Sequence, residues 1–373
     1  MSREDLSESL KAKRIGRRTF IRLAGIAGGG LILSSCAGAV ATPAATKVPA
    51  EAPKPTAAPS PEAKAPAPAP KVSANIDFGA SAGAVALNGL PMMVAEEMGF
   101  FKEEGITEKL VALQANVDII RGALQGSIQL GNPSNVAVAA AVEEGEVVKI
   151  IAENAPFIMA GWIVRADSPI KTLKDIKGKK FGYTAPGSES HIFALSALKS
   201  QGLKEGEDVQ LVVVRGMADQ YTALKNGVID IAWSVDPMIT QGVQNKEIRL
   251  LGTPNEIVSN WSMSSVVVSE DYAKKNPDVL RAYLRAYVKA MDFIKSETDK
   301  AAEIWAKRAK FTPEIGKEAM KNYPIQKFTA KLSSDIFKTQ TEVMLANKLV
   351  KQAPQWDKIV DQSYLPSALQ IKL

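Results

Sequence analysis

Short runs of β-branched and aromatic residues alternate with helical stretches from residue 73 to about residue 269, and this order constrains the fold most strongly. Strands are predicted at 76–78, 110–113, 128–130, 148–152, 162–164, 180–183, 209–214, 229–233, 248–251 and 262–269. Helices are predicted from 90, at 118–125, 136–144, 190–200 and 220–226, from 237, and almost throughout from 277. Alternation of this kind predicts an α/β fold with parallel strands and crossover helices.

The alternation occurs twice, and two extended segments join the two sets of units. We therefore predict two lobes with two hinge crossings and a helical C-terminal tail. Residues 73–162 and 260–373 would form lobe 1, and residues 163–259 would form lobe 2. About 300 residues are enough for two medium domains with their own cores. Ligands of open α/β sheets bind beyond the carboxyl ends of the strands.

Residues 1–35 have the features of an export signal. Arg17 and Arg18 precede Thr19 in a basic segment, and the stretch 23–33 that follows is apolar. A membrane-spanning helix needs about 20 apolar residues, whereas the core of a signal peptide needs roughly 7 to 15. The paired arginines resemble the twin-arginine signal, which a receptor reads and whose usual cargo is exported folded. The alternative is that the pair is the charged end of an ordinary signal.

Cys36 closes the apolar stretch, after Leu33, Ser34 and Ser35. This pattern resembles a lipobox, in which a cysteine is lipidated and becomes the new N-terminus. Cys36 is the only cysteine in 373 residues, so an intrachain disulfide is impossible. A lone cysteine can also be a small buried hydrophobic residue. The position of Cys36 favours lipidation, which would tether the chain to the extracytoplasmic face of the cell membrane.

Residues 36–72 would then be the lipidated cysteine and a linker. The segment 37–72 holds nine prolines and thirteen alanines and no aromatic residue, a composition that cannot bury a core. The net charge of +6 also belongs to the N-terminal part. Residues 1–35 have seven Lys and Arg against three Asp and Glu, and residues 37–72 have four against two, which leaves 35 of each sign in 73–373. We therefore expect no nucleic acid partner.

Several segments resemble the substrate-binding proteins of ABC importers, in the group for nitrate, sulfonates and taurine that is related to thiamine-precursor binders. The segments are 91–106 (PMMVAEEMGFFKEEGI), 122–131 (GALQGSIQLG), 173–183 (LKDIKGKKFGY) with 186–188 (PGS), and 223–232 (ALKNGVIDIA). The resemblance covers most of 75–295. It implies the two-lobed periplasmic-binding-protein fold of type II.

The resemblance also implies a function. The two lobes would close over a small anionic or heterocyclic solute, and an ABC permease in the membrane would receive it. We expect a monomer that needs no cofactor or metal and catalyses no reaction. Two alternatives stay open: an enzyme of the thiamine-pyrimidine type, whose members carry a cysteine-rich metal motif, and a sensory ligand-binding subunit.

Loops that follow strands supply the candidate ligand-binding residues. In lobe 2, the loop that opens a helix contains Gly187, Ser188, Ser190 and His191, whose backbone N–H groups would point at an anion or a carbonyl oxygen. One of these serines could simply cap the helix.

The other candidate residues are Ser81, Asn132, Ser134, Trp162 and Asp236. Ser81, Asn132 and Ser134 belong to loops of lobe 1, where capping is the competing role. Trp162 could form an apolar wall or belong to the core, and Asp236 could supply a polar contact. His191 is the sole histidine, so no motif supports a metal site or a catalytic triad built on it.

Overall fold

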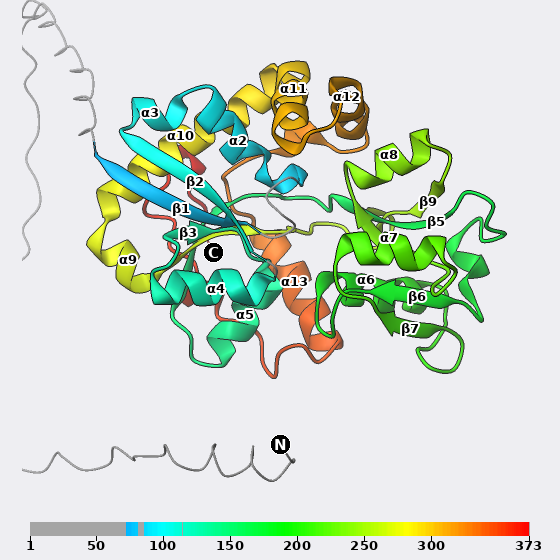
Figure 1. The fold of residues 1–373 in the computed structure, drawn as a ribbon. Coiled ribbons are helices and arrows are strands. Elements are labelled where there is room, and N and C mark those ends of the chain that lie inside the picture. Colours follow the sequence, from blue (N-terminus) through cyan, green and yellow to red (C-terminus); the bar gives the residue numbers. More distant parts are fainter. Residues whose placement is uncertain (1–71, 81–85, 114, 373) are drawn as a thin grey trace, which may run out of the picture. The chain divides into compact units, whose positions relative to one another are not determined.

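The computed structural model describes residues 72–80, 86–113 and 115–372 (Figure 1). The predicted export signal at Arg17 and Arg18, the lipidation of Cys36, the linker and the ligand contact of Ser81 lie outside these residues. In the described part, no helix combines the length and the apolar character needed to cross a membrane.

Five strands form the first sheet, in the order β2-β1-β3-β10-β4. They are β1 (Ala74–Ala80), β2 (Ile106–Ala112), β3 (Leu130–Gly131), β4 (Val148–Glu153) and β10 (Ser265–Ser269). Helices α2 (Leu90–Glu97) and α10 (Pro277–Ser296) cover one face, and α4 (Asn116–Gln125) and α5 (Asn135–Glu143) cover the other (Figure 1). The short helix α3 (Phe100–Glu103) follows α2 after Gly99, whose φ of 75° is left-handed.

Five further strands belong to the second part of the chain. They are β5 (Ala160–Arg165), β6 (Lys180–Tyr183), β7 (Gln210–Val213), β8 (Ala232–Val235) and β9 (Ile248–Gly252). One sheet has the order β8-β5-β9 and the other pairs β6 with β7 in parallel. A bridge between Phe181 and Ile231 connects the two. Helices α6 (Glu189–Ser200), α7 (Met217–Lys225) and α8 (Met238–Gln244) accompany these strands.

Two strands run against the predicted direction. β10 is antiparallel to β3 and β4, and β5 is antiparallel to β8 and β9. The alternation predicted parallel strands with crossover helices, and these two strands depart from that direction. The reason is that the chain enters each of these strands from a crossing segment and not from a crossover helix. The chain leaves one sheet at the carboxyl ends of its strands and enters the other sheet where the strands of that sheet also have their carboxyl ends. The entering strand must therefore run antiparallel to its neighbours.

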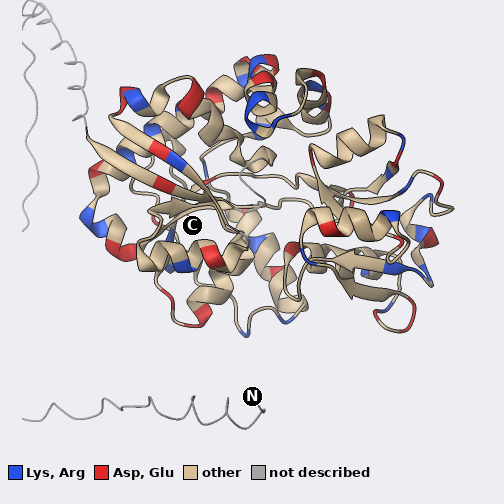
Figure 2. Cartoon of the chain, in the orientation of Figure 1, with Lys and Arg blue, Asp and Glu red and all other residues tan. Residues whose placement is uncertain are grey.

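The C-terminal part is helical, as predicted. It contains α9 (Glu270–Lys275), α10, α11 (Thr298–Ala309), α12 (Pro313–Lys321), α13 (Ser334–Ala346) and α14 (Trp356–Ile359). Short 3-10 turns complete the described elements: η2 (Leu87–Gly89), η3 (Leu173–Ile176), η4 (Pro254–Glu256), η5 (Ile325–Lys327) and η6 (Ser367–Leu369). Figure 2 shows acidic and basic residues interspersed along the outer helices, in keeping with the balanced charge of 73–373.

The apolar face of α10 builds the core of the first sheet. Tyr283 and Tyr287 are fully buried, and the ring of Tyr283 stacks on Phe78 of β1 and on Phe101 of α3. These positions are four residues apart, which places them on one side of the helix. The lobe boundaries remain a prediction. Met344 of α13 and Val350 after it belong to the core of the second part, so the C-terminal segment contacts both sets of strands.

Candidate functional site

Three hydroxyl groups meet at the start of α6, and we refer to Thr184, Ser188 and Ser190 as the α6 hydroxyl cluster. Oγ1 of Thr184 lies 2.7 Å from Oγ of Ser190 and 3.0 Å from Oγ of Ser188, and the two serine oxygens are 2.9 Å apart. Ser188 is also the N-cap, because its Oγ accepts a 3.3 Å hydrogen bond from the N–H of His191. The cluster therefore lies directly at the positive end of a twelve-residue helix.

His191 is fixed as a neutral donor beside this cluster. The backbone N–H of Gly187 donates to its Nδ1 at 3.1 Å, which leaves the ring proton on Nε2. Burial lowers the pKa of His191, and the charge of Glu205 opposes this only in part. Its ring stacks on Tyr183, with the ring centroids 4.5 Å apart. Gly187 has a φ of 75°, a left-handed conformation that glycine adopts without strain.

Asn132 and Ser134 follow β3 at the carboxyl edge of the first sheet. Both are buried. Ser134 is the N-cap of α5 and accepts hydrogen bonds from the N–H of Ala137 and from Nδ2 of Asn116. Oδ1 of Asn132 has no partner among the described residues. Capping of α5 thus explains the hydrogen bonds of the Ser134 hydroxyl, whereas Oδ1 of Asn132 is a hydrogen-bond acceptor without a donor among the described residues.

Trp162 and Asp236 are held inside the protein. Trp162 is fully buried in the core of the second part, with its ring edge-on to Phe181 at a centroid distance of 6.0 Å. Asp236 is 2% exposed, and its carboxylate accepts from the N–H of Thr240 at 2.9 Å and from the hydroxyl of Tyr323 at 2.7 Å. Trp162 is therefore a core side chain in this structure, and Asp236 links α8 to the segment after α12.

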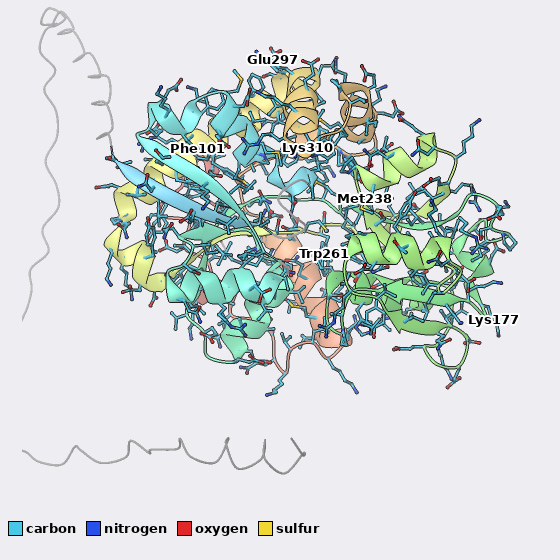
Figure 3. All side chains as sticks on the ribbon, viewed as in Figure 1. Phe101, Lys177, Met238, Trp261, Glu297 and Lys310 are labelled. Atoms are coloured by element: carbon cyan, nitrogen blue, oxygen red, sulfur yellow. The ribbon has the colours of Figure 1, made fainter. Side chains whose placement is uncertain are left out.

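The sequence reasoning missed Trp261 and Glu189. Nε1 of Trp261 donates a 2.9 Å hydrogen bond to Oε1 of Glu189, the first residue of α6. Figure 3 shows Trp261 between the first sheet and α6. The pKa of Glu189 is raised to about 8, mainly by desolvation, although its side chain remains partly accessible and the indole N–H opposes the shift. Trp261 directly precedes the segment 262–269 that was predicted to be extended, and a large aromatic residue at that position was the available signal.

The two crossing segments, 154–159 and 253–264, are also tied to each other. Nδ2 of Asn154 donates to Oγ of Ser264 at 2.8 Å and to the backbone O of Asn88 at 3.0 Å. Oδ1 of Asn154 accepts from the hydroxyl of Tyr287. Asn132 also reaches the carbonyl of Asn88, over a longer distance of 3.5 Å. Asn132 thus joins a polar group in which both crossing segments take part.

Arg215 is a third residue that the sequence reasoning missed. It follows β7, and the N–H of Val214 donates a 2.8 Å hydrogen bond to the carbonyl of Tyr183. This pairing brings Arg215 next to the loop that carries the α6 hydroxyl cluster. Its side chain is exposed, and it forms no ion pair with any residue that the structure describes.

Comparison with known proteins identifies the family. The model of the family described as NMT1/THI5 like matches residues 87–301. The chain belongs to this family. Among solved structures, the periplasmic aliphatic sulphonate binding protein of Escherichia coli has the same fold, with a TM-score of 0.65 and 20% identity. The alignment covers 77% of this NMT1/THI5-like chain and 92% of that chain, which confirms the predicted periplasmic-binding-protein fold.

The names of two curated relatives of this NMT1/THI5-like chain state different activities. A candidate aliphatic sulfonates-binding protein of Bacillus subtilis (strain 168) is 25% identical over 290 residues, which is 75% of this chain and 85% of that protein. A 4-amino-5-hydroxymethyl-2-methylpyrimidine phosphate synthase of Saccharomyces cerevisiae (strain ATCC 204508 / S288c) is 22% identical over 272 residues, or 66% of this chain and 74% of that protein. The relatives of this chain therefore include proteins named as binding proteins and proteins named as enzymes.

Proposed function

We propose that the chain is the extracytoplasmic solute-binding subunit of an ABC importer and that its lobes close over a small organic anion of the sulfonate type. The α6 hydroxyl cluster carries this proposal. It combines three hydroxyl groups with the positive end of a helix, whose first N–H groups have no partner within the helix. A permease in the membrane would receive the solute, and the lipid on Cys36 would keep the receptor near it.

The donors around this cluster suit an anion. Nε2–H of His191 is a neutral donor, and Arg215 supplies a positive charge at the neighbouring strand end. Hydrogen bonds to a charged group are stronger than those between neutral groups. On the opposite lobe, Asn132 lies at the carboxyl edge of the first sheet, where ligands of such folds bind. Each lobe then provides part of the site, and affinity requires closure.

We propose binding without catalysis, because the site lacks the groups that a reaction would need. Nδ1 of His191 accepts from the backbone N–H of Gly187, so it is not available as a base toward the neighbouring serines. The remote similarity to a pyrimidine phosphate synthase makes the enzyme the second candidate. The cysteine-rich metal motif expected of the thiamine-pyrimidine enzymes cannot be built in this chain, whose single cysteine is at position 36.

Calorimetry on the full chain in detergent tests the choice of solute. Ethanesulfonate should bind, and ethyl methyl sulfone, which keeps two S=O groups but has no charge, should not. Ser190→Ala should weaken ethanesulfonate binding roughly tenfold, since it removes a hydroxyl beside a charged ligand. Ser196→Ala is the matched control: it lies on the same helix and bonds only to the carbonyl of Ile192. Equal binding of the sulfone would rule out recognition of the anion.

Fractionation of cells tests the location. Cys36→Ser should either release the protein from the membrane or leave an unprocessed precursor, while the affinity for ethanesulfonate stays unchanged. Membrane association of the processed variant at the wild-type level would contradict lipidation at Cys36, independently of the solute.

A further inference from the structure

The two crossing segments lie side by side as a continuation of the pairing between β4 and β10. The backbone N–H groups of Asn154 and Ala155 both donate to the carbonyl of Ser264, at 3.2 and 3.1 Å. The N–H of Met263 donates in return to the carbonyl of Ala155 at 2.8 Å. A change in the relative position of the lobes must move these paired segments, so the side chains that hold the segments together affect the hinge.

Glu153 fastens both segments from inside. It is 1% exposed, and its Oε1 accepts three hydrogen bonds: from the N–H of Asn154 at 2.9 Å, from the N–H of Ala155 at 3.1 Å and from Oγ of Ser262 at 2.6 Å. The first two donors belong to the outgoing segment and the third to the returning one. One carboxyl oxygen thus joins the two crossings.

The other oxygen of Glu153 lacks a donor. Oε2 is buried without a partner, and no Lys or Arg of the described chain forms an ion pair with this carboxyl group. An ionised carboxylate can only accept, so a buried one needs donors or a cation at both oxygens. A protonated carboxyl group carries no net charge, so its burial without a cation costs less, although an O–H at Oε2 also lacks an acceptor among the described residues. The burial of Glu153 without a neighbouring cation therefore favours the protonated form.

The surroundings of Glu153 are polar but uncharged. Ser265 stands opposite Glu153 in the register of β4 and β10, and its hydroxyl is also buried without a partner. Gln340 of α13 donates to the carbonyl of Ser262 and accepts from Nδ2 of Asn135 on α5. From α10, Tyr287 is the titratable group that faces the carboxyl, and its own pKa is raised well above the usual value by burial. Nothing in this set balances a negative charge.

We propose that Glu153 is a proton-dependent pin of the hinge, which holds the two crossing segments together when protonated and loosens them when it loses its proton. Burial supports this, since it raises the pKa of Glu153 to about 7 against the opposing hydrogen bonds from Ser262, Asn154 and Ala155. Because the pKa is higher in the folded chain than its ordinary 4.5, the stabilisation is complete below pH 4.5 and is lost as the pH rises through about 7. The inference concerns the hinge and does not depend on the solute.

Hydrogen–deuterium exchange of the full chain in detergent, without solute, tests the pin. After correction for the intrinsic exchange rates, protection of 154–159 and 253–264 should fall on the order of tenfold between pH 5.5 and pH 8.5. Glu153→Gln, which keeps a neutral side chain, should remove this fall in 154–159. In 253–264 part of the fall should remain, because Trp261 donates to Glu189, whose pKa is raised to about 8. Glu108→Gln is the matched control, because the pKa of Glu108 is also raised, to about 8, but this residue lies on β2 at the far edge of the sheet.

Two results would overturn the proposal. The first is equal protection of both segments at pH 5.5 and pH 8.5 in the wild-type protein. This comparison does not require a variant. The second is a folded Glu153→Gln variant that keeps the wild-type fall. Infrared spectra add an independent readout: the protonated carboxyl C=O band at pH 5.5 should be weaker in Glu153→Gln than in wild type, since Glu108 and Glu189 still contribute to it. A band of equal strength in both proteins counts against the pin.

Discussion

The indole Nε1 of Trp261 donates a 2.9 Å hydrogen bond to Oε1 of Glu189 across 72 positions of sequence. Trp261 belongs to the returning crossing segment, and Glu189 is the first residue of α6, beside the α6 hydroxyl cluster. The ring of Trp261 also packs edge-on to Phe193 of the same helix, at a centroid distance of 5.0 Å. The hinge and the proposed anion site are therefore in direct contact.

Trp261→Phe should weaken solute binding. Phenylalanine keeps the aromatic contact with Phe193 but removes the hydrogen bond to Glu189, which costs about 1 kcal/mol of conformational stability. Calorimetry with ethanesulfonate and thermal unfolding measure the two effects. Trp356→Phe is the control, because it removes a similar 2.8 Å hydrogen bond to Thr341 away from α6. Loss of affinity in both variants to the same degree would argue against a special role of Trp261.

Glu189→Gln should make stability less dependent on pH. The pKa of Glu189 is raised to about 8 in the folded chain, so its stabilising contribution is complete below pH 4.5 and disappears as the pH rises through 8. Glu108 and Glu153 also have raised pKa values and contribute to the wild-type profile. The informative quantity is the difference in melting temperature between wild type and Glu189→Gln from pH 5 to pH 9. A constant difference would contradict the shift at Glu189.

Local features of the fold could be predicted from the sequence, because short-range pattern decides them. The strand predicted at 180–183 is β6 with the same bounds, and the helix predicted at 118–125 lies within α4. The reversed direction of β5 and β10 was missed, since alternation of strands and helices does not say at which edge the chain enters a sheet.

The candidate site was only partly predictable. Ser188 and Ser190 share one loop, so their proximity follows from sequence spacing and the start of a helix. Trp261 and Glu189 meet only because a crossing segment returns past α6, which no local pattern encodes. The burial of Trp162 depends likewise on Phe181 of a different strand.

Tyr323→Phe should destabilise the fold more than Tyr221→Phe does. Its hydroxyl donates to Oδ2 of Asp236, which is 2% exposed, so the substitution leaves a buried carboxylate oxygen without that donor. The expected loss of unfolding free energy is about 1 to 3 kcal/mol, measured by urea denaturation. Tyr221→Phe removes a 2.6 Å hydrogen bond to the more accessible Glu247 and should cost less. The reverse order of the two costs would show that burial of Asp236 does not matter.

Arg215→Gln should lower the affinity for ethanesulfonate without lowering stability. The side chain is exposed and unpaired among the described residues, so its removal breaks no internal contact. Its charge lies at the strand end next to the α6 hydroxyl cluster, where it attracts an anion through solvent; such an exposed charge contributes about 0.2 to 1 kcal/mol. Added salt should therefore reduce wild-type affinity more than that of Arg215→Gln, because screening acts only where the charge is present. Arg121→Gln, which removes another exposed charge, from α4, is the control. If both variants bind ethanesulfonate as the wild type does at every salt concentration, Arg215 takes no part in anion recognition.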